Sequence, residues 1–124
     1  MKRWLVLFSA LLAFAAPQEK IVTLGGDVTE IVYALGASSS LVARDSTSRW
    51  PQAANVLPDV GYLRQLNAEG ILSMRPTLVL ASAQAQPSLA LKQVEQSHVR
   101  VIAVPAANDL SVIDEKVRIV AEAT

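Results

Sequence analysis

The chain has 124 residues, a formal net charge of zero, 52% hydrophobic residues and no cysteine. Once a targeting segment is removed, this length leaves one small domain with a modest core. The balanced charge argues against a nucleic-acid partner, which needs a basic surface, and the lack of cysteine excludes disulfides, thiolate metal sites and a lipid-bearing cysteine.

The first sixteen residues have the pattern of a secretory signal peptide. A positive start (Lys2 and Arg3) precedes an apolar run, residues 4–14, and the small-x-small cleavage signal Ala13-Phe14-Ala15. A membrane anchor is the alternative, but the run is shorter than the roughly 20 residues that span a bilayer. We therefore expect cleavage just after this signal, with residues 1–16 removed, and export to the periplasm of a two-membrane bacterium.

Strand and helix patterns alternate along the rest of the chain. Short apolar runs predict strands at residues 20–24, 41–44, 77–81 and 100–104. Helical periodicity and capping residues predict helices between and after them, with Asp27, Asn67 and Ser111 as N-caps and Pro87 opening the helix before the last strand. Short connections join these elements. The pattern predicts an α/β domain with a parallel sheet flanked by helices.

Polar loops follow the predicted strands. Ligands of such sheets lie outside the C-terminal ends of the strands, so we expect Gly25–Asp27, Asp45–Trp50 and Gly61–Arg64 to gather there. A nucleotide-phosphate loop is an alternative interpretation of Gly25-Gly26. A structural turn is favoured, because the full G-x-G-x-x-G and P-loop patterns are absent.

The central stretch, residues 59–82, is DVGYLRQLNAEGILSMRPTLVLAS. An extended piece breaks at Gly61, a brief helix is predicted over Ala68–Met74, and Arg75-Pro76 ends it. A buried strand follows. A loop that carries a phenol and a guanidinium, Tyr62 and Arg64, is thus held on a rigid frame, which is a common way to build a binding site.

This stretch resembles the N-terminal lobe of periplasmic hemin-binding proteins, the substrate-binding components of bacterial haem ABC importers. The resemblance extends to TLGGDVTEIVYALGA (residues 23–37) and ARDSTSRWPQAA (residues 43–54) and covers essentially all of the chain after the leader. The strand–helix rhythm alone fits any metal-chelate binding protein. The combination of DVGYLR and NAEGIL points to the haem branch. The resemblance therefore implies that residues 17–124 form the N-terminal lobe of such a binding domain, with the second lobe missing.

The resemblance implies that the protein binds haem in the periplasm and hands it to an ABC transporter permease for iron acquisition. An outer-membrane haem receptor is a candidate partner upstream. Tyr62 is implied as the ligand of the haem iron, because a phenolate oxygen suits ferric haem. Arg64 could donate to that phenolate or to a haem propionate. The alternative for Tyr62 is an ordinary loop tyrosine with a solvated hydroxyl.

Three further side chains are candidates for the same ligand. Arg44 and Arg49 could each hold a propionate, since a guanidinium pairs with a carboxylate through two hydrogen bonds, but either could equally face solvent. Trp50 could cover a porphyrin face or cap the core. Glu69 is implied as a docking residue for arginines of the permease. Its alternative is a surface glutamate that complements the dipole of its helix.

Other functions are also open. The chain could bind cobalamin or a ferric siderophore, or it could be a truncated remnant that binds nothing. An electron-transfer haem protein is less favoured, because no C-x-x-C-H attachment motif occurs. An enzyme is not expected, since there is no cysteine, no G-x-S-x-G and no H-E-x-x-H. The single histidine, His98, is predicted late in a helix, and Tyr33 is predicted in the core.

Overall fold

The computed structural model describes residues 18–106 and 109–124. The predicted signal peptide, residues 1–16, lies outside the described residues, and so do the last two residues of the loop that follows residue 104.

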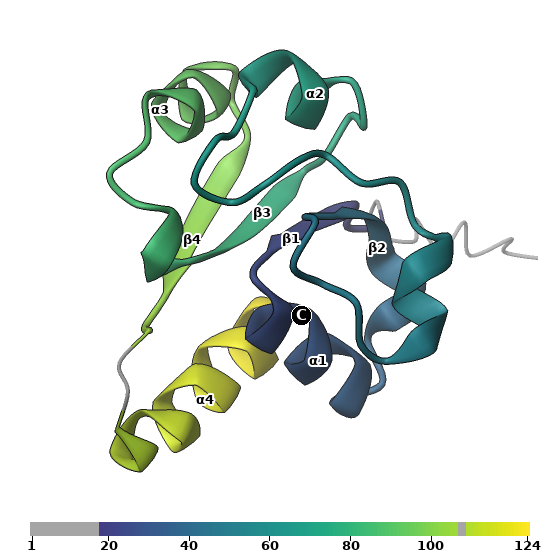
Figure 1. Ribbon diagram of the computed structural model, residues 1–124, viewed down its shortest axis with the longest axis vertical. Helices are drawn as coiled ribbons and strands as arrows, with labels where there is room; N and C mark the ends of the chain where they lie inside the picture. Colours follow the sequence, from purple (N-terminus) through teal and green to yellow (C-terminus); the bar gives the residue numbers. More distant parts are fainter. Residues whose placement is uncertain (1–17, 107–108) are drawn as a thin grey trace, which may run out of the picture.

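Four parallel strands form one sheet (Figure 1). They are β1 (Ile21–Leu24), β2 (Leu41–Arg44), β3 (Leu78–Ser82) and β4 (Arg100–Val104), in the spatial order β2-β1-β3-β4. Every predicted strand is present within one residue of its predicted bounds. The parallel sheet predicted from the alternation of elements is confirmed.

Helices cover both faces of the sheet. The α-helices of the described residues are α1 (Gly26–Ala34), α2 (Ala68–Leu72), α3 (Leu89–Gln96) and α4 (Ile113–Ala123). Figure 1 shows α1 and α4 together on one side of the strands and α2 and α3 together on the other. Short 3-10 helices lie in the connections: η1 (Ser38–Ser40), η2 (Gln52–Val56), η3 (Ala83–Ala85) and η4 (Leu110–Val112).

Alternate side chains of β3 enter two separate cores. Leu78 and Leu80 pack with Val120 of α4, whereas Val79 and Ala81 belong to the cluster that includes Ile71 of α2. Successive residues of a strand point to opposite faces, so a strand covered by helices on both sides must be apolar throughout. This requirement explains the continuous apolar run of β3, which is buried at every position.

Of the three predicted N-caps, one is right and two are wrong. Asn67 caps α2 as predicted: its side-chain oxygen accepts the Glu69 N–H at 2.8 Å. Asp27 is not an N-cap, because α1 begins one residue earlier and Gly25 occupies the cap position. Ser111 is not one either. The Asp109 carboxylate accepts the Ser111 N–H at 3.0 Å and caps η4, a turn that delays the start of α4 to Ile113.

Three other expectations also need correction. Helix α3 begins at Leu89 with Ser88 as its N-cap, so Pro87 lies before the helix and does not open it. Helix α3 ends at Gln96, and His98 lies beyond it with φ 66°, in the left-handed conformation that often follows a helix. His98 is therefore exposed at a helix exit and does not lie late in a helix. Tyr33 is only half buried, at the margin of the core between the sheet and α1.

Candidate functional site

The polar loops predicted to gather at the C-terminal ends of the strands do so. The Gly25 N–H, between β1 and α1, donates to the Asp45 carboxylate at 2.9 Å. The Ser46 N–H, in the loop after β2, donates to the Gly61 carbonyl at 2.9 Å. Hydrogen bonds therefore join all three loops into one continuous edge.

Gly25 permits the tight exit from β1. Its φ of +119° is rarely adopted by residues with a side chain, and a Cβ atom built there would lie 2.8 Å from the Cβ of Ser82. The backbone of the first loop can thus approach the end of β3 only because this position is a glycine.

A hollow of about 370 Å³ opens along this edge. Each of the loops contributes to its wall, which is formed by Gly25–Asp27, Thr47, Leu63, Gln84, Ala106 and Lys116. The hollow thus lies where ligands of parallel α/β sheets bind, beyond the carboxyl ends of the strands.

Tyr62 is held at this edge with its side chain outward. The two neighbours that anchor its loop, Val60 and Leu63, are 9% and 5% exposed, whereas Tyr62 is 44% exposed. Its carbonyl accepts the Gln65 N–H at 2.8 Å and closes a turn. A phenol on a turn with buried anchors is accessible to a ligand while its backbone stays fixed.

The arginines of the site differ in what they contact. Arg64 and Arg49 are exposed, and neither has an ion pair within residues 18–106 and 109–124. Arg44 is largely buried, and its guanidinium contacts the Asp59 carboxylate at 3.4 Å and the Asp45 carbonyl at 3.3 Å. Two arginines are therefore available to an anionic ligand, and the third braces the segment that leads to Tyr62.

One residue of the edge was missed in the sequence. Asp45 is fully buried, and its carboxylate accepts hydrogen bonds from Gly25, Thr47 and Ser48. The available signal was local: an aspartate followed by serine and threonine is typical of a side chain that hydrogen-bonds the next turn. The bond to Gly25, twenty residues away, could be found only in the fold.

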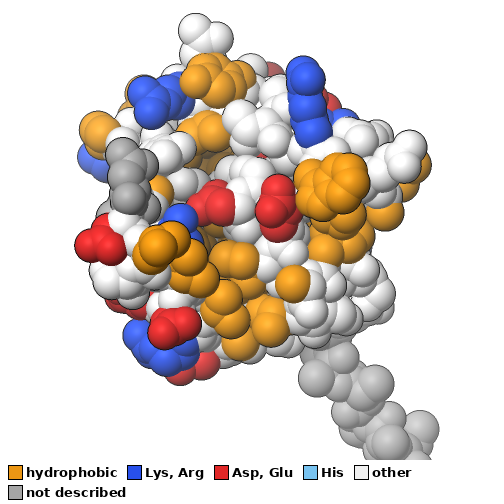
Figure 2. Space-filling model, turned by 60° about the horizontal axis from the view of Figure 1, so that its bottom comes forward, with side chains coloured by type: hydrophobic (Ala, Val, Ile, Leu, Met, Phe, Trp, Pro, Cys, Tyr) orange, Lys and Arg blue, Asp and Glu red, His pale blue; other side chains and the backbone are white. Residues whose placement is uncertain are grey.

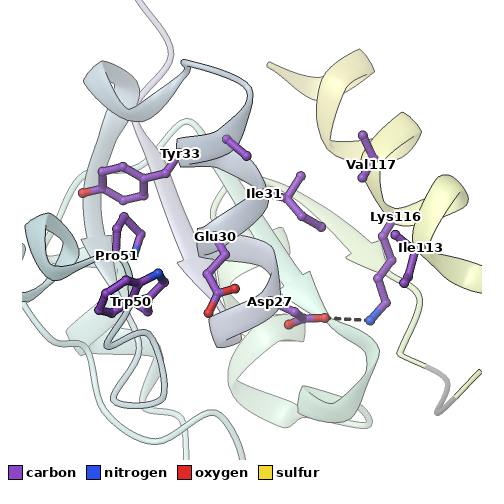
Figure 3. A pocket seen from close by; sticks show the side chains of 10 residues that line it. Asp27, Glu30, Ile31, Tyr33, Trp50, Pro51, Ile113, Lys116 and Val117 are labelled. Carbon is purple, nitrogen blue, oxygen red and sulfur yellow. Dashed lines mark hydrogen bonds and ion pairs between the residues drawn. The ribbon is translucent and has the colours of Figure 1, made fainter. Parts of the chain in front are cut away.

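A second, larger depression of about 700 Å³ runs beside the first, along α1. Figure 3 shows Trp50 and Pro51 on one side of it and Ile113 and Val117 of α4 on the other, with Glu30 on α1 between them. Figure 2 shows hydrophobic side chains gathered around acidic ones on this face.

An ion pair separates the two depressions. Asp27 and Lys116 line both of them, and their side chains meet at 2.9 Å (Figure 3). Trp50 is 66% exposed, so it does not cap the core, and its indole remains available as an apolar wall.

Glu69 lies apart from these depressions. It occupies the first turn of α2, its side chain is exposed, and it does not line either of them. In residues 18–106 and 109–124 there is no cluster of three His, Asp or Glu side chains fit to hold a bare metal ion. Within the same ranges, none of the helices combines the length and the apolar character needed to cross a membrane.

Known structures share this fold. A periplasmic haem-binding protein from Pseudomonas aeruginosa is 40% identical, with a TM-score of 0.80 over 84% of this chain and 37% of that one. The haem-binding protein of Vibrio cholerae is 37% identical, with a TM-score of 0.78 over 86% of this chain and 41% of that one. The vitamin B12-binding protein of Vibrio cholerae is 28% identical, with a TM-score of 0.74 over the same shares.

Curated relatives carry a different ligand in their names. A vitamin B12-binding protein of Vibrio vulnificus is 38% identical over 92 residues, which are 74% of this chain and 33% of the relative. The chain therefore spans about a third of the length of the curated relatives it matches.

The family itself is clear from these matches. The sheet and its helices match the N-terminal lobe of metal-chelate-type periplasmic binding proteins. The family model described as periplasmic binding protein matches residues 21–124, which include every strand and helix of the structure. The chain belongs to the periplasmic binding protein family.

Proposed function

We propose that this chain is the N-terminal lobe of a periplasmic haem-binding protein that delivers haem to an ABC transporter permease for iron acquisition. The observation that carries the proposal is the difference in identity among the solved structures. Four of the haem-binding proteins share 37–40% of residues with this chain, against 28% for the vitamin B12-binding protein of Vibrio cholerae over a similar share of the chain, while a fifth haem-binding protein shares 25%.

The chemistry of the edge agrees with an iron porphyrin. Haem needs an iron ligand, an apolar wall and cations for its propionates. Tyr62 supplies an exposed phenol, whose oxygen suits ferric iron. Arg64 and Arg49 supply exposed guanidinium groups, which bind carboxylates through two parallel hydrogen bonds.

Arg44 has an indirect part in this proposal. Its guanidinium already contacts Asp59, three residues before Tyr62, so a propionate would have to break an existing ion pair to reach it. We propose that Arg44 fixes the start of the Tyr62 loop and that Arg64 and Arg49 face the propionates.

Cobalamin is the second candidate, and the 38% identity to the curated Vibrio vulnificus protein favours it. The two ligands place different demands on the site. Haem needs an iron ligand and cations for two propionates, whereas cobalamin carries amides in place of propionates and has a single phosphodiester as its anionic group.

The test is a parallel titration of the purified mature chain with hemin and with cyanocobalamin, followed by absorbance. We expect saturable binding of hemin with a shifted Soret band, and no saturable binding of cyanocobalamin. Binding of cyanocobalamin without hemin would replace the proposed ligand, and binding of neither would overturn the assignment of a ligand to this lobe.

Location is part of the same proposal. We propose that residues 1–16 direct export and are then removed, so that the mature chain begins near residue 17 in the periplasm. Edman sequencing of the protein from a periplasmic fraction is expected to start just after Ala15 or Ala16. A chain that retains Met1 and stays with the membranes would contradict this expectation.

A further inference from the structure

The carboxylate of Asp45 is the most highly connected polar group of the ligand edge. It is fully buried, and its Oδ1 accepts from the Gly25 N–H at 2.9 Å and the Ser48 hydroxyl at 2.6 Å. Its Oδ2 accepts from the Thr47 N–H at 3.2 Å and the Thr47 hydroxyl at 2.7 Å. Within the described residues Asp45 has no cationic partner. Hydrogen bonds alone therefore satisfy this buried charge.

The donors come from different elements. Gly25 is the N-cap residue of α1, and Thr47 and Ser48 belong to the loop after β2. The network continues inward, because the Thr29 hydroxyl on α1 lies 2.7 Å from both the Ser48 hydroxyl and the Thr23 hydroxyl on β1. All of these side chains except Thr47 are buried. Asp45 thus ties the first strand, the first helix and the second loop to one point.

The same segment also reaches the loop of the proposed iron ligand. The Asp45 N–H donates to the Thr23 carbonyl at 3.1 Å, and the next residue, Ser46, donates its N–H to the Gly61 carbonyl at 2.9 Å. Gly61 immediately precedes Tyr62. A shift of the Asp45 segment would therefore move the loop that presents the phenol.

We propose that Asp45 is a positioning residue, which holds the three loops of the ligand edge at a fixed separation and so places Tyr62 for the iron. The ligand part of this inference rests on the proposed function. Asp45 does not contact the ligand. It acts through Gly25, through Thr47 and Ser48, and through Ser46.

The variant Asp45→Asn tests whether Asp45 positions the loops or only stabilises the fold. The substitution keeps the size of the side chain but turns one oxygen into a donor, which must then face either Gly25 and Ser48 or Thr47. The control is Val120→Ala, a fully buried position on α4, whose core cluster includes Val28 and Val32 of α1 but no residue of the three loops. Both changes lower stability, but only the first disturbs the loops.

Two measurements are made on each variant at a temperature where it is folded. Hemin affinity is expected to fall about tenfold or more in Asp45→Asn, since a charge-assisted hydrogen bond is lost, and to stay within about twofold of wild type in Val120→Ala. Amide hydrogen exchange at Gly25, Ser46 and Thr47 is expected to accelerate in Asp45→Asn relative to the central amides of β3, and to keep its wild-type ranking in Val120→Ala.

If Asp45→Asn does not fold, Ser48→Ala takes its place, because it removes one donor to the carboxylate and leaves the charge. It is expected to show the same two changes to a smaller degree. Wild-type hemin affinity in the variant, or unchanged exchange at the loop amides, would overturn the positioning role. A wild-type chain that binds no hemin would defeat the proposed function instead, and the exchange experiment would still decide whether Asp45 holds the loops.

Discussion

The three arginines near the site look alike in the sequence but have different surroundings in the structure. Arg44 ends β2 and Arg49 lies in the polar loop that follows, and both are candidate propionate ligands. The feature that distinguishes them is Asp59, which lies fifteen residues after Arg44 and pairs with it at 3.4 Å. A contact over that separation leaves no local pattern, so the sequence alone gives no way to rank the two.

This difference predicts opposite outcomes for two alanine substitutions. Arg64→Ala is expected to weaken hemin binding several-fold and leave stability unchanged, because the side chain is exposed and unpaired within the described residues. Arg44→Ala is expected to cost about 2 kcal/mol of unfolding free energy, since it removes a largely buried side chain and the donor to the Asp45 carbonyl. Asp59 keeps its hydrogen bonds from Ser46 and Gly61. Urea denaturation and hemin titration of both variants check these expectations. A stability loss in Arg64→Ala larger than in Arg44→Ala would show that the environments have been misassigned.

Among the secondary-structure elements, the sequence predicts best those features that depend on residues close together in the chain. The four strands could be predicted because each is a short apolar run between polar or glycine-containing segments, and Asn67 could be predicted as a cap because its bond to Glu69 spans two residues. Ser111 failed because it lies inside η4, a turn that Asp109 caps and that precedes α4. Asp27 failed because the N-cap position of α1 is taken by Gly25, which makes no side-chain hydrogen bond and so leaves no capping pattern in the sequence.

Two glycines with positive φ provide a matched test of the β1–α1 connection. Gly25 has φ +119° and a hypothetical Cβ 2.8 Å from Ser82, whereas Gly36 has φ +74° and nothing within 4 Å. Gly36→Ala is expected to cost about 1 kcal/mol from backbone strain alone. Gly25→Ala is expected to cost roughly 2 kcal/mol more, because φ 119° with ψ 130° lies outside the left-handed helical region and because the new Cβ would lie 2.8 Å from the Cβ of Ser82. Thermal unfolding of both variants measures the difference, and equal losses would mean that the close approach at Ser82 is not a constraint.

In the whole molecule, Glu69 and the candidate ligand edge lie on different elements. Glu69 lies on α2, among the helices that cover the opposite face from α1 and α4 (Figure 1). Like Tyr62, it does not line the hollow at the strand ends. A docking role for Glu69 is implied by family resemblance alone, and within residues 18–106 and 109–124 its carboxylate forms no ion pair. A role in binding another protein therefore has to be tested apart from ligand binding.

Glu69→Ala is expected to leave hemin affinity unchanged and to weaken association with a detergent-solubilised haem ABC permease by several-fold. Glu95→Ala is the matched control, because Glu95 is also an exposed glutamate, on the neighbouring helix α3. Surface plasmon resonance against the permease measures both variants. Equal weakening in the two would reduce the effect to general surface charge, and a loss of hemin binding in Glu69→Ala would place this residue at the ligand site.

We expect haem at this edge to be held through the Tyr62 oxygen. Tyr62→Phe removes one oxygen from a 44% exposed side chain and keeps the ring, so the fold is expected to stay intact. The most direct measurement is the visible absorption spectrum of each protein during a hemin titration. We predict that the wild-type chain shows the charge-transfer bands of phenolate-ligated ferric haem, and that Tyr62→Phe loses those bands together with at least about tenfold in affinity. Identical spectra and affinities for the two proteins would contradict the account, because the iron would then be held by another group.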